Sequence, residues 1–540
     1  MARHLPSGRN EWWRSGVIYQ VYPRSFRDSN ADGMGDLNGI AEGLAAIRDL
    51  GVDAIWLSPF YSSPQKDAGY DVSDYRDVDP LFGSLADFDN MLNKAHELGL
   101  KVMIDLVPNH TSDQHPWFQK ALKSSAGSKE RERYLFRDGK GENGELPPNN
   151  WLSLFGGPAW TRVADGQWYC HLFDTSQPDL NWDNHEVRAE FESILRFWLD
   201  RGVDGFRVDQ PHAMVKQQGL PDHPYVEQAG AGFIEGREAP PMWFQEGVHE
   251  IFRSWRKILD GYPGERAMCG EAYVLPLSLM AKWVRPDEFH QTFNFRFLDA
   301  GWEKEPLVNA IDESFEAFDE VGAPATWVLN NHDVIRHVSR FGGEYGRATA
   351  SDGIGPESPQ PDNELGLHRA KAATLFMLGL PGSAYLYQGE ELGLPEHTTI
   401  ESEYRQDPTY FRTAGARVGR DGCRVPLPWK SGGESNGFSE GRGWLPQPES
   451  FAALSRDNQE RESSSTLSLY RQALKLRKEH ELGAGGFEWL SKNDVLSYSN
   501  SGVSVIQNFS DEPIAIAGEV LISSAAGELL APGATAWVRN

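Results

Sequence analysis

Residues 40–60 read IAEGLAAIRDLGVDAIWLSPF and combine an amphipathic helix, a glycine and a short apolar strand. Apolar residues recur at helical spacing up to Leu50, and Gly51 offers the left-handed conformation that commonly ends a helix. The run DAIWLSPF then follows as a strand with apolar residues on both faces. A strand of this kind is typical of a parallel sheet that is covered on both sides.

The same order of helix, glycine and strand recurs downstream. A second predicted helix ends before Gly99 and is followed by a strand at 102–107, and a third ends before Gly202. A fourth unit is centred on Gly379. Crossover helices between apolar strands leave two architectures open, a closed (β/α)8 barrel and an open doubly wound sheet.

The number of strands favours the barrel. No phosphate-binding glycine motif follows the first strand, which argues against a nucleotide-binding open sheet. Eight is the strand number of a TIM barrel, so we predict a (β/α)8 fold. The candidate strands are 17–23, 53–58, 102–107, 204–208, 267–270, 289–294, 326–330 and 383–388.

Uneven spacing predicts additions to the barrel. Gly99 and Gly202 are about twice as far apart in the chain as Gly51 and Gly99, which indicates a lobe inserted after the third strand, over the barrel mouth. The tail alternates short strand runs with turn residues and predicts a small antiparallel β domain. The expected division is 1–108 barrel, 109–180 inserted domain, 181–465 barrel with an excursion at about 393–445, and 466–540 last helix and C-terminal β domain.

Composition excludes several classes of function. The 540 residues suit either three to four domains of roughly 150 residues or one large barrel with appendages. Lys and Arg number 52 against 78 Asp and Glu, a net charge of −26, which repels nucleic-acid phosphates and anionic lipid. We therefore expect neither a nucleic-acid partner nor a membrane partner.

Cysteine content points to a reduced compartment. The chain has three cysteines, none in a CxxC or Cys/His cluster, so a disulfide scaffold and a zinc site are not expected. The N-terminal residues lack the apolar core of a secretion signal, and no apolar run is long enough to span a membrane. The sequence predicts a soluble cytoplasmic protein.

Acidic residues stand at the ends of several predicted strands, which is where the active site of a (β/α)8 barrel lies. The segments DLVPNH (105–110), GFRVD (205–209), GEAYV (270–274) and NNHD (330–333) bring an arginine, two histidines and the three carboxylates of Asp209, Glu271 and Asp333 toward one rim. Convergent carboxylates without Cys or His ligands leave two interpretations open, an oxygen-ligated metal site and glycosidic chemistry.

These four segments, in this order and in register with the strands, resemble the motifs of the α-amylase family of glycoside hydrolases (family 13). Within it the chain is similar to the α-glucosidase and oligo-1,6-glucosidase group, of which QPDLNW (177–182) is a marker. The resemblance covers essentially the whole chain.

The resemblance implies a retaining mechanism with three catalytic residues. Asp209 would attack the anomeric carbon, and Arg207 on the same strand face would keep the pKa of Asp209 low. Glu271 would act as acid and base, with a raised pKa and a separation from Asp209 of roughly 5 to 5.5 Å. Asp333 would bind sugar hydroxyls and support the distorted ring.

The resemblance also implies a pocket for one terminal glucose, and hence exo-action on short substrates. His110 and His332 would donate to sugar hydroxyls, Tyr70 would stack on the ring, and Phe173 would form a wall. The expected substrate-binding residues are Asp67, Tyr70, His110, Phe173, Arg207, His332, Arg424 and Arg420.

A cation-binding loop is visible before the first helix. Gly33 takes the sharp-turn position of an EF-hand-like loop, but Gly39 stands where an EF-hand has its bidentate glutamate. The oligoglucosidase group carries a similar first-loop site, which implies a structural Ca²⁺ or Mg²⁺ and no organic cofactor. The expected ligands are Asp28, Asn30, Asp32, Met34 through its carbonyl, and Asp36.

Two features depart from the family pattern. Gln210 follows the nucleophile where relatives have a small residue that influences linkage, so α-1,4, α-1,6 and other linkages stay open. The segment 293–302, FNFRFLDAGW, replaces an arginine-rich segment and makes sucrose isomerase a minor alternative. Lys216 follows the pattern of bacterial α-glucosidases.

The sequence therefore predicts an exo-acting retaining α-glucosidase that acts on a small α-glucoside, with transglucosylation as a further reaction. The enzymatic alternative is a transglucosidase or a sucrose- or trehalose-converting isomerase. A non-catalytic binding module is the remote alternative, since all three carboxylates are present. Monomer and homodimer both stay open.

Overall fold

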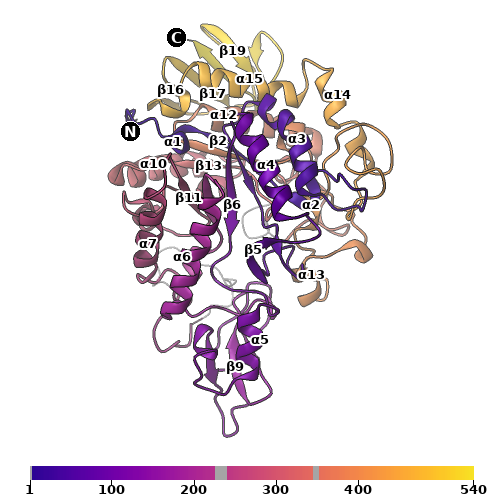
Figure 1. Ribbon diagram of the computed structural model, residues 1–540. Coiled ribbons are helices and arrows are strands. Elements are labelled where there is room, and N and C mark those ends of the chain that lie inside the picture. The colour runs from indigo at the N-terminus through magenta and orange to yellow at the C-terminus, as the bar shows by residue number, and fades with distance from the viewer. Residues whose placement is uncertain (1–2, 225–239, 344–351, 540) are drawn as a thin grey trace.

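The structure is a computed structural model and describes residues 3–224, 240–343 and 352–539 (Figure 1). Eight parallel strands form one sheet in the order β12-β11-β10-β6-β3-β2-β14-β13. The N–H of Asn294 donates to the carbonyl of Thr326 at 3.0 Å and links the two outermost strands, which confirms the (β/α)8 prediction. The strands are β2 (Val17–Val21), β3 (Ala54–Leu57), β6 (Lys101–Leu106), β10 (Gly205–Val208), β11 (Ala267–Gly270), β12 (Gln291–Thr292), β13 (Thr326–Val328) and β14 (Ser383–Tyr387).

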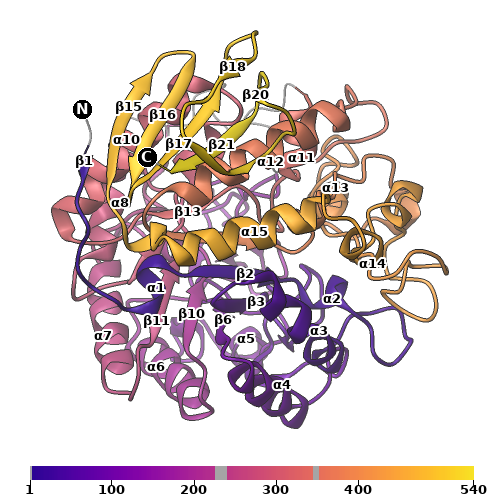
Figure 2. The ribbon, with the colours of Figure 1, turned by 90° about the horizontal axis from the view of Figure 1, so that it is seen from above.

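Amphipathic helices surround the strands, as the view from above shows (Figure 2). Gly51, the C-cap of the first of them, has φ of 102°, and Gly202 has φ of 101°, as predicted for helix ends. The long helices are α3 (Leu37–Leu50), α4 (Leu85–Glu97), α6 (His185–Asp200), α7 (Val248–Asp260), α10 (Lys304–Val321), α12 (Asn363–Gly379) and α15 (Thr466–Glu479). The short ones are α1 (Trp12–Ser15), α2 (Pro23–Phe26), α8 (Leu277–Ala281), α9 (Phe295–Asp299), α11 (His337–Phe341), α13 (Pro408–Arg412) and α14 (Arg456–Glu460).

Gly379 has a different reason to be glycine. It is the last residue of α12 and adopts no left-handed conformation; the glycine that does is Gly382, with φ of 107°. A Cβ on Gly379 would lie 2.5 Å from the hydroxyl of Tyr498 and 2.6 Å from Cγ2 of Val505. The position is therefore set by close packing of the C-terminal domain on α12.

The chain between β6 and α6 forms a lobe that projects from one end of the barrel (Figure 1). It contains α5 (Pro116–Lys123) and an antiparallel sheet of β7 (Phe136–Asp138), β9 (Gln167–Cys170) and β8 (Trp160–Arg162). A bridge between His110 and Asp179 brings the two ends of this segment together at the barrel. A short antiparallel pair, β4 (Tyr61–Ser62) and β5 (Asp74–Val78), lies in the loop after β3 and was not predicted.

The C-terminal domain is an antiparallel sheet with the order β1-β15-β16-β17-β21-β19. Its first strand, β1 (Arg3–His4), comes from the N-terminal segment assigned to the barrel. Helix α15, grouped with this domain in the sequence, also packs against α3 and α12 of the barrel. The remaining strands are β15 (Phe487–Lys492), β16 (Val495–Asn500), β17 (Val503–Asn508), β18 (Ile514–Ala515), β19 (Glu519–Ser523), β20 (Leu529–Leu530) and β21 (Thr535–Arg539).

Two further observations concern the whole described chain. Cys170, Cys269 and Cys423 are buried free thiols, as expected for a chain without a disulfide scaffold. Among residues 3–224, 240–343 and 352–539, no helix is both long and apolar enough to cross a lipid bilayer.

Candidate active site

The strand register brings two acidic residues to one level of the barrel, nearer the carboxyl ends of the strands than Arg207 and Asp105. Arg207 of β10 lies opposite Asp105 of β6 on one side and Cys269 of β11 on the other. The N–H of Asp209 then donates to Leu106 at 2.8 Å, and the N–H of Glu271 donates to Val208 at 2.9 Å. The residues after β10 and β11 therefore stand side by side at the carboxyl ends of neighbouring strands, as predicted.

Arg207 is the cation that these acids share. Its Nη1 donates to Oδ1 of Asp105 and Oδ1 of Asp209, both at 2.8 Å, and its Nη2 lies 3.1 Å from Oε2 of Glu271. The Arg207 side chain is fully buried, and its guanidinium lies 4.9 Å from the centre of the Trp56 ring. One arginine thus faces three carboxylates, of which Asp105 is fully buried and Asp209 and Glu271 are nearly so.

Asp105 begins one of the four predicted motif segments, but no role was predicted for it. Its Oδ2 accepts hydrogen bonds from the Trp56 indole at 3.2 Å and from the Tyr70 hydroxyl at 3.1 Å. Burial raises the pKa of Asp105 to about 6, although Arg207 acts in the opposite direction. Asp105 therefore fixes both Arg207 and Tyr70 in place.

Glu271 has the acidity that a proton donor requires. Burial raises its pKa to about 7, with the negative charge of Asp333 acting in the same direction and Arg207 opposing both. At neutral pH a substantial fraction of Glu271 is therefore protonated. A glycosidic acid catalyst needs this property before bond cleavage.

Asp209 does not have the low pKa predicted from its arginine neighbour. Burial raises its pKa well above the usual range, Arg207 opposes this, and the charges of Glu271 and Asp105 raise it again. The prediction is wrong for the free site because one guanidinium is divided among three carboxylates. These three acids therefore titrate as an interacting group and not independently.

Asp333 is instead surrounded by basic groups. Its Oδ1 accepts from Nη1 of Arg420 at 2.9 Å and from Nη2 of Arg424 at 2.8 Å, and its Oδ2 lies 3.3 Å from Nε2 of His332. Burial alone would raise the pKa of Asp333, but His332 and the two arginines hold it well below its usual range. Burial lowers the pKa of His332 itself well below its usual range, so this ring carries little positive charge. We therefore attribute the low pKa of Asp333 to the two arginines.

A second group of predicted residues meets beside this one. Asp67 accepts from Nη2 of Arg420 at 2.9 Å and from Nε2 of Gln177 at 3.0 Å, and burial raises its pKa to about 6. Nε2 of His110 lies 3.2 Å from the same Gln177 nitrogen. Gln177 was expected only as part of a motif that marks the oligo-1,6-glucosidase group. In the structure it contacts two predicted substrate-binding residues, Asp67 and His110.

Aromatic rings stand among these polar groups. The Tyr70 ring stacks on His332 with centroids 5.3 Å apart and an interplanar angle of 6°. The Phe173 ring lies 5.0 Å from the His110 ring. All four side chains are buried, so the structure brings every predicted substrate-binding residue to one end of the barrel.

Arg420 links more of the site than the sequence indicated. Besides Asp67 and Asp333, its Nε donates to Oδ2 of Asp407 at 2.6 Å. Asp407 is fully buried, caps the first turn of α13 and was not predicted, because an Asp-Pro pair reads only as a helix start. Arg420 thereby connects the loops after β3, β13 and β14.

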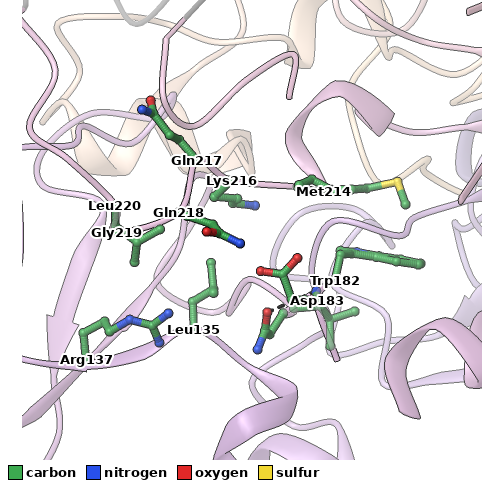
Figure 3. A pocket seen from close by; sticks show the side chains of 13 residues that line it. Leu135, Arg137, Trp182, Asp183, Met214, Lys216, Gln217, Gln218, Gly219 and Leu220 are labelled. Atoms are coloured by element: carbon green, nitrogen blue, oxygen red, sulfur yellow. Dashed lines mark hydrogen bonds between the residues drawn. The ribbon is translucent and has the colours of Figure 1, made fainter. Parts of the chain in front are cut away.

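Lys216 belongs to a different location. Its Nζ donates to Oδ1 of Asn109 at 2.8 Å and lies 2.9 Å from Oδ2 of Asp179. With Leu135 and Arg137 of the lobe it lines a cavity of about 330 Å³, which the three strand-end carboxylates do not line (Figure 3). Lys216 therefore ties the loop after β10 to the lobe.

Residues 20–486 match the family model described as "Alpha amylase, catalytic domain". A "Probable alpha-glucosidase" of Rhizobium meliloti is 38% identical, over 93% of this chain and 90% of its own length. An "Oligo-1,6-glucosidase" of Parageobacillus thermoglucosidasius is 35% identical, over 93% and 91%. Among solved structures, an alpha-glucosyl transfer enzyme superimposes with a TM-score of 0.85 at 36% identity, over 98% of this chain and all of that one.

Proposed function

Because the chain belongs to the α-amylase family of glycoside hydrolases, we propose that it is an exo-acting retaining α-glucosidase that releases terminal glucose from short α-glucosides. The observation that carries the proposal is the pair of carboxylates, Asp209 and Glu271, on neighbouring strand ends and on one guanidinium. Both retaining and inverting glycosidases use two carboxylates that flank the scissile bond, and membership of the α-amylase family is the ground for the retaining assignment.

In the proposed reaction Asp209 attacks the anomeric carbon while Glu271 protonates the departing oxygen. A covalent glucosyl-enzyme forms, and Glu271, now ionised, removes a proton from the water that hydrolyses it. Asp333, ionised by its arginine neighbours, faces the positive charge that develops on the ring. Arg207 balances the carboxylates throughout.

Exo-action is supported by how the site is enclosed. Arg420 joins Asp67 to Asp333, and Gln177 joins Asp67 to His110, so four separate parts of the chain meet around one sugar position. Hydrogen-bonding groups of this kind match the hydroxyls of a terminal glucose. A single enclosed position suits one terminal unit better than an internal stretch of polymer.

The first test is product analysis on maltose, isomaltose, sucrose, trehalose, nigerose and kojibiose. The proposal predicts free glucose as the main product from at least one of them, with retained α configuration in the first product. If disaccharide isomers accumulate with little glucose, the chain is a transglucosidase or isomerase. That alternative is supported by the similarity to an alpha-glucosyl transfer enzyme. The same panel determines the linkage preference.

The pH profile should reflect Glu271. Its protonated form starts the reaction, so kcat/KM should fall as the pH rises through a value near the pKa of about 7. The measurement is kcat/KM from pH 4 to 10 on a disaccharide that the panel shows to be hydrolysed, because its leaving group depends on protonation. A profile that stays flat up to pH 9 would contradict the assignment of Glu271 as the acid.

We also propose that the loop at 28–36 holds a structural Ca²⁺ or Mg²⁺. Asp28, Asn30 and Asp32 present oxygens of the kind these cations bind, and Asp28 also accepts from the N–H of Gly33 at 2.8 Å. Asp36 fits less well, because it caps α3 through the N–H of Gly39 at 2.7 Å. In the described residues, no three His, Cys, Asp or Glu side chains form a metal-binding group, so the backbone carbonyl of Met34 and the Asn30 amide would have to contribute.

Chelation tests this cation. We expect EDTA to lower the melting temperature of the protein by a few degrees, and added Ca²⁺ or Mg²⁺ to restore it, since a ligand that binds only the folded state stabilises it. Calorimetry on the wild type and on Asp32→Ala measures this. The variant should melt lower and no longer respond to EDTA; a wild type indifferent to both treatments refutes the cation.

A further inference from the structure

Gln210, which departs from the family pattern, contacts the proposed acid catalyst. Its Nε2 donates to Oε2 of Glu271 at 2.8 Å, and its backbone N–H approaches the same oxygen at 3.3 Å. The residue adopts a left-handed conformation, with φ of 41° and ψ of 44°. This region is unfavourable for a residue with a side chain, so the surrounding contacts must hold it there.

Two hydrogen bonds and one ion pair converge on one oxygen of Glu271. Besides the two donating nitrogens of Gln210, Nη2 of Arg207 lies 3.1 Å from Oε2 but is not aligned for a hydrogen bond. Within the part of the chain that the structure describes, no hydrogen bond is found at Oε1. An oxygen that accepts from two N–H groups beside a guanidinium is a poor place for a proton, which would itself have to be donated to an acceptor.

We propose that Gln210 is a positioning residue that keeps Oε2 of Glu271 as an acceptor, so that Oε1 carries the proton and delivers it to the glycosidic oxygen. This inference rests on the proposed glucosidase function and deepens it. Gln210 acts through Glu271 and needs no contact with the sugar. During cleavage the proton passes from Oε1 to the leaving oxygen, and the electron pair of the O–H bond stays on the carboxylate.

Removing the amide donor should change the pH profile in a defined direction. The charged groups around Glu271 are Arg207, Asp209, Asp105 and Asp333. Burial raises the pKa of Glu271 to about 7, and the hydrogen bond from the backbone of Gln210 lowers it, because donors stabilise the ionised form. Loss of the side-chain donor should therefore raise this pKa and move the basic limb of kcat/KM to higher pH.

The test uses three variants of the full-length protein. Gln210→Met keeps the length of the side chain but cannot donate, Gln210→Glu replaces the donor by an acceptor, and Gln210→Asn keeps an amide that is too short to reach. For the Met variant we expect the basic limb to rise by about one pH unit. The shift should be larger for Glu and present for Asn.

Leaving-group dependence provides a second readout. Without Gln210 the proton divides between both oxygens, which penalises a substrate that needs acid assistance. On maltose, or on the hydrolysed disaccharide that the panel identifies, kcat should fall by about tenfold more than on 4-nitrophenyl α-glucoside, whose leaving group needs little protonation. A merely structural role would lower both rates together and leave the pH profile unchanged.

The outcomes separate this inference from the proposed function. If the wild type hydrolyses no substrate of the panel, the proposed glucosidase function is wrong, whatever the role of Gln210. If the wild type is active and the Met variant keeps its pH profile and its ratio of rates, Gln210 does not position Glu271. An Asn variant that behaves as wild type overturns the inference as well, since only the left-handed backbone would then matter.

Discussion

The Asp209→Asn variant is expected to lose at least about four orders of magnitude in kcat while keeping its fold. An amide cannot form the glucosyl ester, and the other catalytic groups cannot replace that step. Asn has the size of Asp, and Arg207 retains Asp105 and Glu271 as partners, so the melting temperature should change little. Turnover on 4-nitrophenyl α-glucoside and calorimetry measure the two quantities.

Two comparisons make this result specific. Asp494→Asn removes a carboxylate that is exposed and paired with Lys304, and it should leave turnover at the wild-type level. Glu271→Gln should lose activity far more severely on disaccharides than on 4-nitrophenyl α-glucoside, because only the former depend on protonation of the leaving group. If Asp209→Asn turns over at near-normal rates, Asp209 is not the nucleophile.

The second large effect concerns Arg207. In Arg207→Met, Asp105, Asp209 and Glu271 lose the cation they share inside a buried site. Removing one partner of a buried ionic group destabilises a protein by about 3–5 kcal/mol. Activity should fall by several orders of magnitude, because the protonation of both catalytic carboxylates changes.

The stability loss should depend on pH, and its sign follows from burial. Burial already raises the pKa of Asp105 to about 6 with Arg207 present, and the variant raises it further. A carboxyl with a higher pKa in the folded than in the unfolded state stabilises the fold at low pH and loses this contribution as the pH rises. The melting-temperature deficit of Arg207→Met should therefore grow from pH 5 to pH 8.

A matched variant controls for the loss of a long side chain. Arg539→Met removes an exposed arginine of β21 that pairs with the exposed Glu519, and its deficit should be small at every pH. A deficit of Arg207→Met that is small, or that shrinks with rising pH, would show that Arg207 does not balance the three carboxylates.

The positions of the proposed catalytic residues were predictable because barrel geometry leaves little freedom. The carboxyl ends of parallel strands meet at one rim, so Asp209, Glu271 and Asp333 had to come together once the strands were recognised. The spacing of hydrophobic residues and the glycines after the helices were sufficient to recognise the strands.

The features that the sequence did not predict depend on charges shared by several groups and on contacts between residues far apart in the chain. The pKa of Asp209 was predicted wrongly because the spacing of two residues identifies Arg207 as its neighbour. That spacing does not reveal that Asp105 and Glu271 contact the same arginine. Asp407 was missed because its partner, Arg420, follows through an irregular loop that has no period. Strand β1 was missed because a two-residue strand carries no pattern of its own.

The three partners of Arg420 have a consequence for biosynthesis. Asp67, Asp333 and Asp407 all precede Arg420 in the chain, the first of them by 353 positions. A polypeptide still growing on the ribosome therefore carries the proposed nucleophile and acid long before it carries the arginine that joins the proposed glucose-binding loops. Until translation has passed this residue, Asp67 and Asp333 lack that shared cation. Hydrolytic activity should thus report a chain that extends past Arg420, and a nascent fragment ending before the loop after β14 should bind no sugar.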